Sequence, residues 1–187
     1  HLQNEFQVVV AGDGHFARHA VRAVSVHYAG AQTGYGPLVA GASGLSYFTL
    51  RSMFESGAHF LPEARDRIVR GPKVQRFGPP IDRLSPERLR ALDTVRVEDC
   101  IPYEDGVFAR VALLPPGAVL PVRHEGPSSG QYQMVLAGSL RADGRALEAL
   151  EMVFLASDEV DADLVAGPAG AQVLSLQLPR RAAEYGS

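Results

Sequence analysis

Several side chains that could bind a small molecule lie in the first third of the sequence. Arg51 could bind a carboxylate through two parallel N–H donors of its guanidinium group, or form a weak surface pair with Glu55. Tyr35, in Tyr35-Gly36-Pro37, could cover a cavity, although such a sequence is more often a simple turn. His27 and Tyr28 are neighbours on an expected strand, so only one of them can face a ligand. The residue types therefore predict a small polar binding site.

A second group of polar residues lies in the other half of the chain. His124, Gln131 and Gln133 could form a pocket for a small ligand, or they could fill a barrel by hydrogen bonding to one another. Cys100 has no base near it in the sequence, which is typical of an unreactive thiol. The sequence contains no phosphate-binding glycine loop with Lys-Ser/Thr, no Gly-x-Ser-x-Gly elbow and no Cys-x-x-Cys pair. These absences argue against nucleotide, serine-hydrolase and dithiol chemistry.

Composition narrows the class of protein further. The 187 residues carry a net charge of −3, and 7% of them are aromatic, so there is no broad basic field for nucleic acid or an anionic membrane. No apolar run approaches the roughly 20 residues of a membrane span. The single cysteine fits a reducing compartment. We therefore expect a cytoplasmic protein with a small-molecule ligand and with neither a nucleic-acid nor a membrane partner.

The sequence repeats itself at one fixed offset. Residues 5–12 (EFQVVVAG) are echoed by residues 131–138 (QYQMVLAG). The same offset aligns Leu38–Gly41 with Leu164–Gly167, Gly44 with Gly170, and Tyr47–Leu50 with Val173–Leu176. Three segments in one register indicate a duplicated unit, which has to be recognised before a fold is assigned.

Short apolar-alternating segments separated by glycine predict β-strands rather than helices. Residues 5–12 alternate as a strand, and Gly12-Asp13-Gly14 is expected to form the tight turn that ends it. Residues 41–44 (GASG) are expected to divide two further strands. Because no long helical pattern lies between these segments, the sequence predicts an all-β sandwich or barrel.

The repeat divides the chain into two expected domains. The first covers residues 1–70 and the second residues 95–187, with a linker at residues 71–94. Within the linker, Ser85-Pro86-Glu87 predicts a short helix that ends near Asp93, because Ser is a good capping residue and Pro suits the first helical position.

The spacing of these residues resembles that of the cupin family. Its first motif, G(X)5HXH(X)3–4E(X)6G, is matched by His1, Glu5 and Gly12, and the second copy has Gln131 and Gly138 in the E(X)6G positions. Gly117 and His124 lie close to the G…H spacing of the same motif. The resemblance covers nearly the whole chain and implies a bicupin, with two tandem cupin-type jelly-roll β-barrels joined by a short helical linker.

The resemblance also implies a metal site in the N-terminal barrel. His1 and Glu5 would be ligands, with His27 or Gln32 opposite, and the metal would be a divalent transition metal such as Fe, Mn, Ni or Zn. Alternatively, Glu5 is a solvated acid at the start of a strand. In the C-terminal barrel Gly126 and Gln131 replace two ligands, so no metal is expected there. In the second copy, residues 107–117 precede the strand at residues 131–138 that repeats residues 5–12. We therefore expect the native chain to begin before His1, where a further His would restore the HXH pattern.

Two functions remain open from the sequence. The first is a small-molecule-active bicupin, such as a metal-dependent oxygenase or isomerase with its site in the N-terminal barrel. The second is a non-catalytic binding or sensory bicupin without metal. Candidate pocket residues for either function are Tyr35, Arg51, His124, Gln131 and Gln133. The family resemblance also implies a homodimer.

Overall fold

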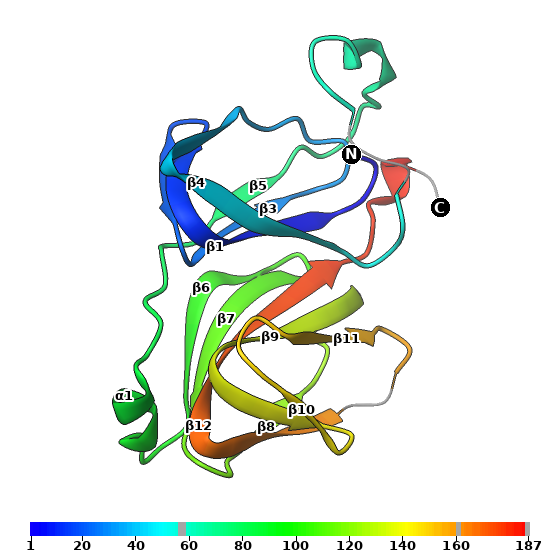
Figure 1. Ribbon diagram of the computed structural model, residues 1–187. Helices are drawn as coiled ribbons and strands as arrows, with labels where there is room; N and C mark the ends of the chain where they lie inside the picture. Colours follow the sequence, from blue (N-terminus) through cyan, green and yellow to red (C-terminus); the bar gives the residue numbers. More distant parts are fainter. Residues whose placement is uncertain (56–58, 160–161, 186–187) are drawn as a thin grey trace. The chain divides into compact units, whose positions relative to one another are not determined.

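The computed structural model describes residues 1–55, 59–159 and 162–185 (Figure 1). Most of them lie in antiparallel β-strands, and the prediction of an all-β fold is confirmed. The chain divides into two compact units. Unit 1 contains residues 1–81 together with the C-terminal residues from Arg180, and unit 2 contains residues 82–179.

Unit 1 is a curled sheet built around its first strand. The strands follow the order β2 (His19–Arg22), β1 (Glu5–Phe16), β3 (Ser25–Ala29) and β5 (Gln75–Phe77), and β4 (Leu38–Arg51) also pairs with β1. All of these pairs are antiparallel. Val9, Phe16 and Val21 pack together in the interior. Since β1 pairs with three strands, it positions most of the interior side chains of unit 1.

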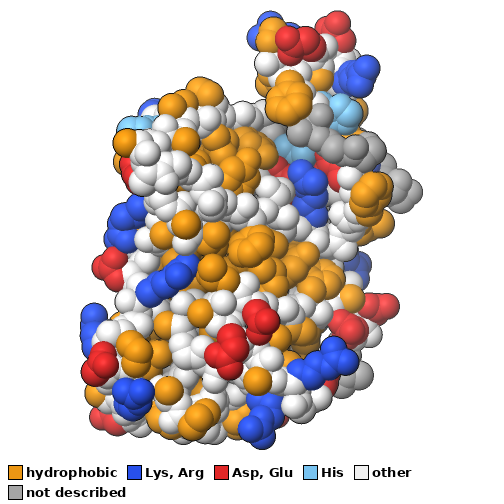
Figure 2. All heavy atoms as spheres, viewed as in Figure 1, with side chains coloured by type: hydrophobic (Ala, Val, Ile, Leu, Met, Phe, Trp, Pro, Cys, Tyr) orange, Lys and Arg blue, Asp and Glu red, His pale blue; other side chains and the backbone are white. Residues whose placement is uncertain are grey.

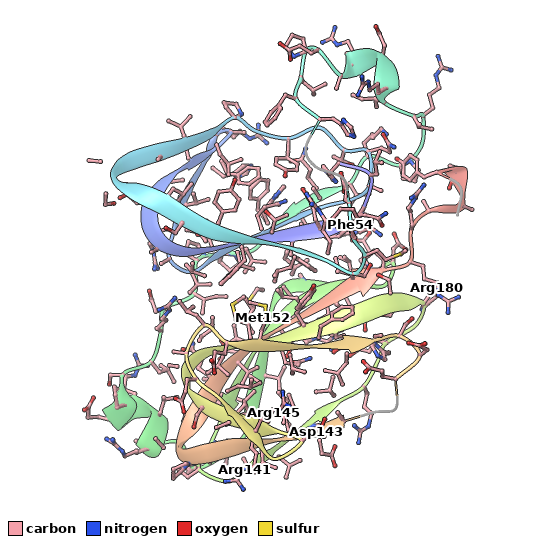
Figure 3. The ribbon with its side chains drawn as sticks, turned by 45° about the vertical axis from the view of Figure 1, so that its right-hand side comes forward. Phe54, Arg141, Asp143, Arg145, Met152 and Arg180 are labelled. Atoms are coloured by element: carbon pink, nitrogen blue, oxygen red, sulfur yellow. The ribbon has the colours of Figure 1, made fainter. Side chains whose placement is uncertain are left out.

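Unit 2 is a larger sheet of the same kind. The strand order is β10 (Arg145–Leu147), β9 (Ser128–Ala142), β12 (Ala162–Pro179), β7 (Val107–Leu114) and β6 (Arg96–Glu104); β11 (Met152–Ala156) pairs with β9, and β8 (Val119–Val122) pairs with β12. Its apolar core includes Leu114, Val135, Leu140 and Val173, all of them almost fully buried. The hairpin from β9 to β10 turns at Asp143-Gly144, where both φ angles are positive, 47° and 77°, as a tight hairpin requires (Figure 3).

The two units share one strand register. In unit 1 Glu5 lies opposite Arg51 in the β1–β4 ladder, and in unit 2 Gln131 lies opposite Gln177 in the β9–β12 ladder. Each ladder contains a bulge at the equivalent place, between Val9 and Ala11 in unit 1 and facing the Gln172–Val173 step in unit 2. The offset found in the sequence therefore also relates the strand pairs residue by residue.

Glycines mark the close approach of strands within each repeat. Gly12 has a φ of 78°, and a Cβ atom there would lie 2.0 Å from the carbonyl oxygen of Gly44. The equivalent Gly138 has a φ of 74° and would place a Cβ atom 2.1 Å from the oxygen of Gly170. Only glycine tolerates both the positive φ and this contact.

Two turns predicted from glycine are wrong for this reason. β1 does not end at Gly12-Asp13-Gly14 but continues to Phe16, which pairs with His19 across a two-residue turn. β4 likewise runs without a break through residues 41–44. In both strands glycine serves a bulge or a close backbone contact, and the chain does not reverse there.

The segment expected to be a linker contains more structure than the sequence indicates. Helix α1 (Pro86–Arg90) begins as predicted, and the Ser85 side chain accepts a hydrogen bond from the Arg88 N–H. However, residues 75–77 form β5 and belong to the sheet of unit 1. Two short 3-10 turns complete the elements, η1 (Arg65–Arg67) and η2 (Ala183–Tyr185).

The visible surface is mixed in charge. Figure 2 shows basic and acidic side chains interspersed on one face, in agreement with the small net charge. In the part of the chain that the structure describes, none of the helices has the length and apolar character needed to cross a membrane.

Candidate functional site

A buried carboxylate lies at the centre of unit 1. β1 places Glu5 and Gln7 on the same side of the sheet, and both side chains are almost fully buried. Arg51, opposite on β4, donates from Nε to Glu5 Oε2 at 2.6 Å, and the Tyr35 hydroxyl donates to Glu5 Oε1 at 2.5 Å. Glu5 is thus not the solvated acid that the sequence allowed. The guanidinium group of Arg51 and the phenol of Tyr35 both stabilise its charge.

This pairing changes the proton affinity of both partners. Burial raises the pKa of the Tyr35 phenol, and the hydrogen bond to Glu5 and the charge of that carboxylate raise it further. Burial alone would lower the pKa of Arg51, but the hydrogen bond to Glu5, the charge of Glu5 and the nearby Glu55 and Tyr35 together raise it. Both groups therefore keep their protons and act as donors.

A chain of amides leads from Glu5 to a buried histidine. Gln7 Nε2 donates to Glu5 Oε1 at 2.6 Å, and the carbonyl oxygen of the Gln7 side chain lies 2.6 Å from Nδ1 of His27. His27 Nε2 lies 3.3 Å from the side-chain oxygen of Gln75. Burial lowers the pKa of His27 to about 4, although the contact with Gln75 opposes this shift. The imidazole is therefore neutral near pH 7, and its Nδ1–H donates to Gln7.

The other two predicted metal ligands have different surroundings. His1 Nε2 lies 3.7 Å from Glu5 Oε1, but its ring nitrogens are 2.7 and 2.8 Å from the carbonyl oxygens of Gln3 and Thr33. Gln32 accepts a hydrogen bond from the Val69 N–H through its side-chain oxygen, at 3.4 Å. The structure brings His1 and Glu5 together, while Gln32 faces another segment.

This donor set does not fit a metal ion as it is arranged. Within residues 1–55, 59–159 and 162–185, no three His, Cys, Asp or Glu side chains come together in a metal-binding group. A cation at Glu5 would have to displace the Arg51 guanidinium group, and it would meet His1 nitrogens that already face carbonyl oxygens. The predicted metal site of His1, Glu5, His27 and Gln32 stays a prediction, without support from this geometry.

A large cavity in unit 1 opens beside this network. Its volume is about 840 Å³, and Tyr35 and Arg51 bring the network to its wall. The apolar part of the wall comes from Leu38, Tyr47, Phe60, Leu61 and Ile68. Arg67 and His59 add further basic groups. We call this space the large cavity.

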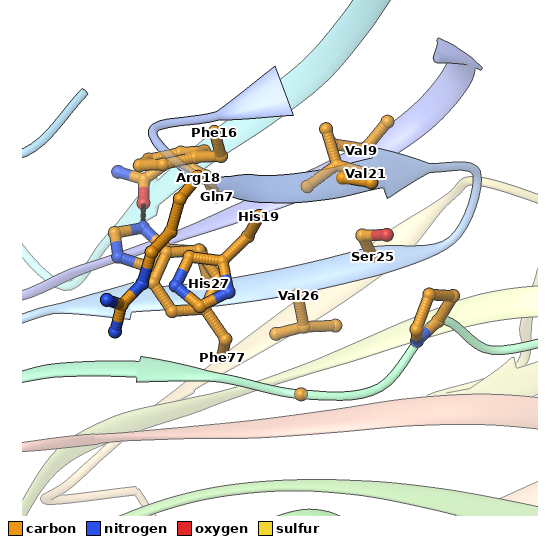
Figure 4. A pocket seen from close by; sticks show the side chains of 13 residues that line it. Gln7, Val9, Phe16, Arg18, His19, Val21, Ser25, Val26, His27 and Phe77 are labelled. Carbon is orange, nitrogen blue, oxygen red and sulfur yellow. Dashed lines mark hydrogen bonds between the residues drawn. The ribbon is translucent and has the colours of Figure 1, made fainter. Parts of the chain in front are cut away.

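The small cavity lies at the other end of the amide chain (Figure 4). Its volume is about 330 Å³, and its wall includes His27, Gln7, Phe16 and Phe77. The rings of His19 and Phe77 are stacked, with centroids 3.9 Å apart. The sequence did not single out Gln7, Gln75 or Phe77, because uncharged amides and one aromatic residue between Gly-Pro pairs carry no chemical signature.

Unit 2 has uncharged side chains at the positions that Glu5 and Arg51 occupy in unit 1. Gln131 Nε2 donates to Gln177 Oε1 at 2.8 Å, where unit 1 has the Glu5–Arg51 ion pair. Gln133 Nε2 donates to Gln131 Oε1 at 3.1 Å, and the Ser175 hydroxyl donates to Gln133 at 2.6 Å. These side chains hydrogen-bond to one another, as expected from the alternative in which Gln131 and Gln133 fill the barrel and do not bind a ligand.

His124, the remaining predicted pocket residue of unit 2, has a hydrogen-bond partner on one of its two ring nitrogens. His124 Nε2 lies 3.1 Å from the Ala156 carbonyl oxygen, and its Nδ1 is buried without a hydrogen-bond partner. His124, Gln131 and Gln133 line neither the large nor the small cavity. Of the predicted pocket residues, Tyr35 and Arg51 therefore line the large cavity of unit 1.

Comparisons with known proteins give the fold. No protein-family model matches the chain, and neither does any curated protein. A solved protein from Nostoc punctiforme has a TM-score of 0.50 at 9% identity, and the match covers 97% of this chain and 65% of that chain. Protein Ylba from E. coli has a TM-score of 0.50 at 15% identity, with coverage of 97% and 70%. The fold is an all-β jelly roll.

A third similar structure names a family. It is a Cupin 2 conserved barrel domain protein from Salinispora arenicola, 18% identical, and the match covers 54% of this chain and 88% of that chain. Its TM-score is 0.35. The chain spans less than two thirds of the Nostoc protein. At these identities the similarities show a shared fold, and function has to be argued from the site.

Proposed function

We infer that the chain is a bicupin whose unit 1 binds a small organic anion in the large cavity, without a metal. The volume of about 840 Å³ lies within the usual range for small-molecule sites. Strand registers that agree residue by residue between the two units support the two-barrel part of the proposal.

The charge of the cavity wall is the observation that carries the choice of ligand. Arg51, Arg67, His1 and His59 line it, and none of the described lining residues is an Asp or a Glu. Glu5, the nearby buried carboxylate, is already bound to Arg51. A guanidinium-lined cavity attracts a carboxylate or another anion, since charge-assisted hydrogen bonds are stronger than neutral ones.

The rest of the wall defines the body of the ligand. Tyr47, Phe60 and Leu61 give the cavity an apolar side, and Phe60 and Leu61 are strongly exposed to solvent. Removing such surfaces from water is worth about 25 cal/mol per Å². The cavity therefore suits an organic acid that carries an aliphatic or aromatic group.

Matched acids and amides test the proposal. Hexanoate and benzoate should raise the midpoint of thermal unfolding of the chain and bind in calorimetric titrations, whereas hexanamide and benzamide should bind more weakly. Arg67→Gln should weaken acid binding by about tenfold, roughly 1.4 kcal/mol. Arg65→Gln is the control, because Arg65 lies in the same 3-10 turn but does not line the cavity.

Two results would overturn the proposal. Amides that bind as well as the acids would remove the role of charge. Binding that disappears on treatment with a chelator and returns with Fe, Mn, Ni or Zn would favour the metal-dependent function expected from the family resemblance.

A further inference from the structure

The small cavity of unit 1 contains a histidine whose hydrogen bonding is incomplete. Gln7 donates from its amide nitrogen to Glu5 at 2.6 Å, so its side-chain oxygen faces His27. Nδ1 of His27 therefore carries the ring hydrogen and donates it to Gln7. In an imidazole of this form, Nε2 has a lone pair and can only accept a hydrogen bond.

The lone pair of His27 faces a second acceptor. Nε2 lies 3.3 Å from the side-chain oxygen of Gln75. The amide nitrogen of Gln75 donates to the Gly34 carbonyl oxygen at 3.0 Å, which keeps the Gln75 oxygen turned toward His27. Two acceptors thus meet without a hydrogen between them, although His27 is only 2% exposed. Because a buried acceptor without a donor is unfavourable, a bound molecule that supplies an N–H or O–H group would be stabilised at this place.

The wall around this acceptor is apolar and aromatic. Figure 4 shows the rings of Phe16, His19, His27 and Phe77 gathered at one end of the cavity, and the side chains of Val9, Val21, Ser25 and Val26 at the other. The centroids of the Phe16 and His27 rings are 4.1 Å apart, and those of His19 and Phe77 are 3.9 Å apart. Packed rings of this kind offer faces and edges to a further ring.

The repeat shows that the fold does not require a histidine here. His27 lies opposite Gln7 in the β1–β3 ladder, and its counterpart in unit 2 is Val153, opposite Gln133. Val153 packs against the apolar core of unit 2. Unit 1 thus has a buried polar ring where the duplicated fold can use a small apolar side chain, which favours a role in binding for His27.

The cavity is also independent of the outer side of β4. None of its described lining residues belongs to β4; they come from β1, β2, β3, β5 and the turns beside these strands. In unit 2, β7 and β8 pair with β12, the counterpart of β4. Equivalent strands in unit 1 would therefore pair with a strand that contributes nothing to this wall.

We propose that the small cavity binds a neutral, ring-shaped molecule of about the size of indole, whose N–H or O–H group donates to Nε2 of His27. The volume of about 330 Å³ lies at the low end of the range for small-molecule sites and is roughly twice that of a cavity that holds benzene. None of the described lining residues is an Asp or a Glu, and Arg18, which carries a permanent charge, is exposed to solvent. A neutral molecule therefore suits the buried part of the wall.

This site is separate from the proposed anion site. The small and large cavities share no lining residue among those described. The proposal for the small cavity does not rest on the binding of an organic acid, so either can fail without the other.

Indole and benzofuran test the role of the donor. The two molecules have the same two-ring shape, but benzofuran carries an oxygen where indole has its N–H group. In calorimetric titrations near pH 7, indole should bind about tenfold more tightly than benzofuran, because benzofuran would bring another acceptor to His27. Equal affinities, or no binding of indole at about 1 mM, would overturn the proposal.

A substitution taken from the repeat assigns the effect to one residue. His27→Val introduces the side chain found at the equivalent position of unit 2, and it should reduce the tenfold preference for indole to about onefold. His15→Val is the matched control, since His15 is exposed on β1 and lines neither cavity, and it should keep the preference. Circular dichroism checks that both variants are folded. A preference that survives in His27→Val, or that is lost equally in His15→Val, would contradict the assignment.

Two measurements on the unchanged chain complete the test. In nitrogen-15 spectra of the histidine rings, the Nε2 resonance of His27 should shift upfield on addition of indole but not of benzofuran, because only indole donates to it. A saturating amount of benzoate, the probe for the large cavity, should leave the dissociation constant of indole unchanged within about twofold. An unchanged Nε2 resonance, or displacement of indole by benzoate, would show that indole does not occupy this site.

Discussion

Replacing the buried ion pair of unit 1 by the amide pair of unit 2 tests the equivalence of the two units. Glu5 and Arg51 occupy the positions that Gln131 and Gln177 occupy in the second ladder. Glu5→Gln and Arg51→Gln should each destabilise unit 1 when made alone. Together they should recover much of the lost stability, because unit 2 already contains two glutamines in this arrangement.

The structure sets the size of each effect. Arg51→Gln leaves a fully buried carboxylate that keeps its hydrogen bonds from Tyr35 and Gln7 but loses its guanidinium partner, so the free energy of unfolding should fall by about 3 kcal/mol, at the low end for a broken buried ion pair. Glu5→Gln leaves Arg51 partly exposed and 3.6 Å from Glu55, so we expect about 2 kcal/mol. The double variant should lose no more than about 2 kcal/mol, which gives a coupling energy of about 3 kcal/mol.

The assay has to resolve unit 1 from unit 2. Urea unfolding followed by circular dichroism gives the free energies, and hydrogen exchange of peptides from β1 and β4 assigns the loss to unit 1. The same exchange measured on β9 and β12 is the internal control and should not change. If the double variant loses the sum of the two single losses, the residues are not coupled and the proposed equivalence of the pairs is refuted.

Three further predictions follow from local geometry. Gly12→Ala should lower the free energy of unfolding by about 2–5 kcal/mol, because its φ is positive and its Cβ would overlap the backbone of Gly44. Gly44→Ala has the same φ but no atom within 4 Å of its Cβ, so it should lower that free energy by about 1–2 kcal/mol. Equal losses of the two variants in urea unfolding would contradict the overlap at Gly12. Because burial lowers the pKa of His27 to about 4, the folded state binds a proton at this residue less well than the unfolded state does. The free energy of unfolding should therefore fall by about 3 kcal/mol as the pH drops from 6.5 to about 4. A His27→Gln variant that kept this pH dependence would refute the assignment to His27. Burial raises the pKa of Cys100 to about 11, so its thiol should react with iodoacetamide far more slowly than free cysteine at about pH 8, and rapid labelling would show that the thiol is accessible.

The repeat made much of the fold predictable from the sequence. Its offset located β1, β4, β9 and β12, and the capping Ser85 located the start of α1. Glycine was misinterpreted at residues 12–14, since a glycine that permits a bulge and a glycine that permits a turn look alike in a single sequence.

The site was harder to predict because its contacts are distant in the sequence. The sequence offered Glu55, four residues away, as one possible partner of Arg51, but the strand register brings Arg51 closer to Glu5. Gln7 gave no signal, although it connects Glu5 to His27. Local patterns identify charged residues, whereas the partner of each charge depends on strand pairing.

The shared register has a practical consequence for protein engineering. Because β1, β3 and β4 align with β9, β11 and β12 position by position, including the bulge, segments could be exchanged between the two halves without altering loop lengths. A chimera that received the β9 and β12 segments in place of β1 and β4 would keep both glycine contacts and would carry an amide interior throughout. Such hybrids would separate the stability that comes from the strand register and the glycine contacts from the stability that comes from the interior side chains.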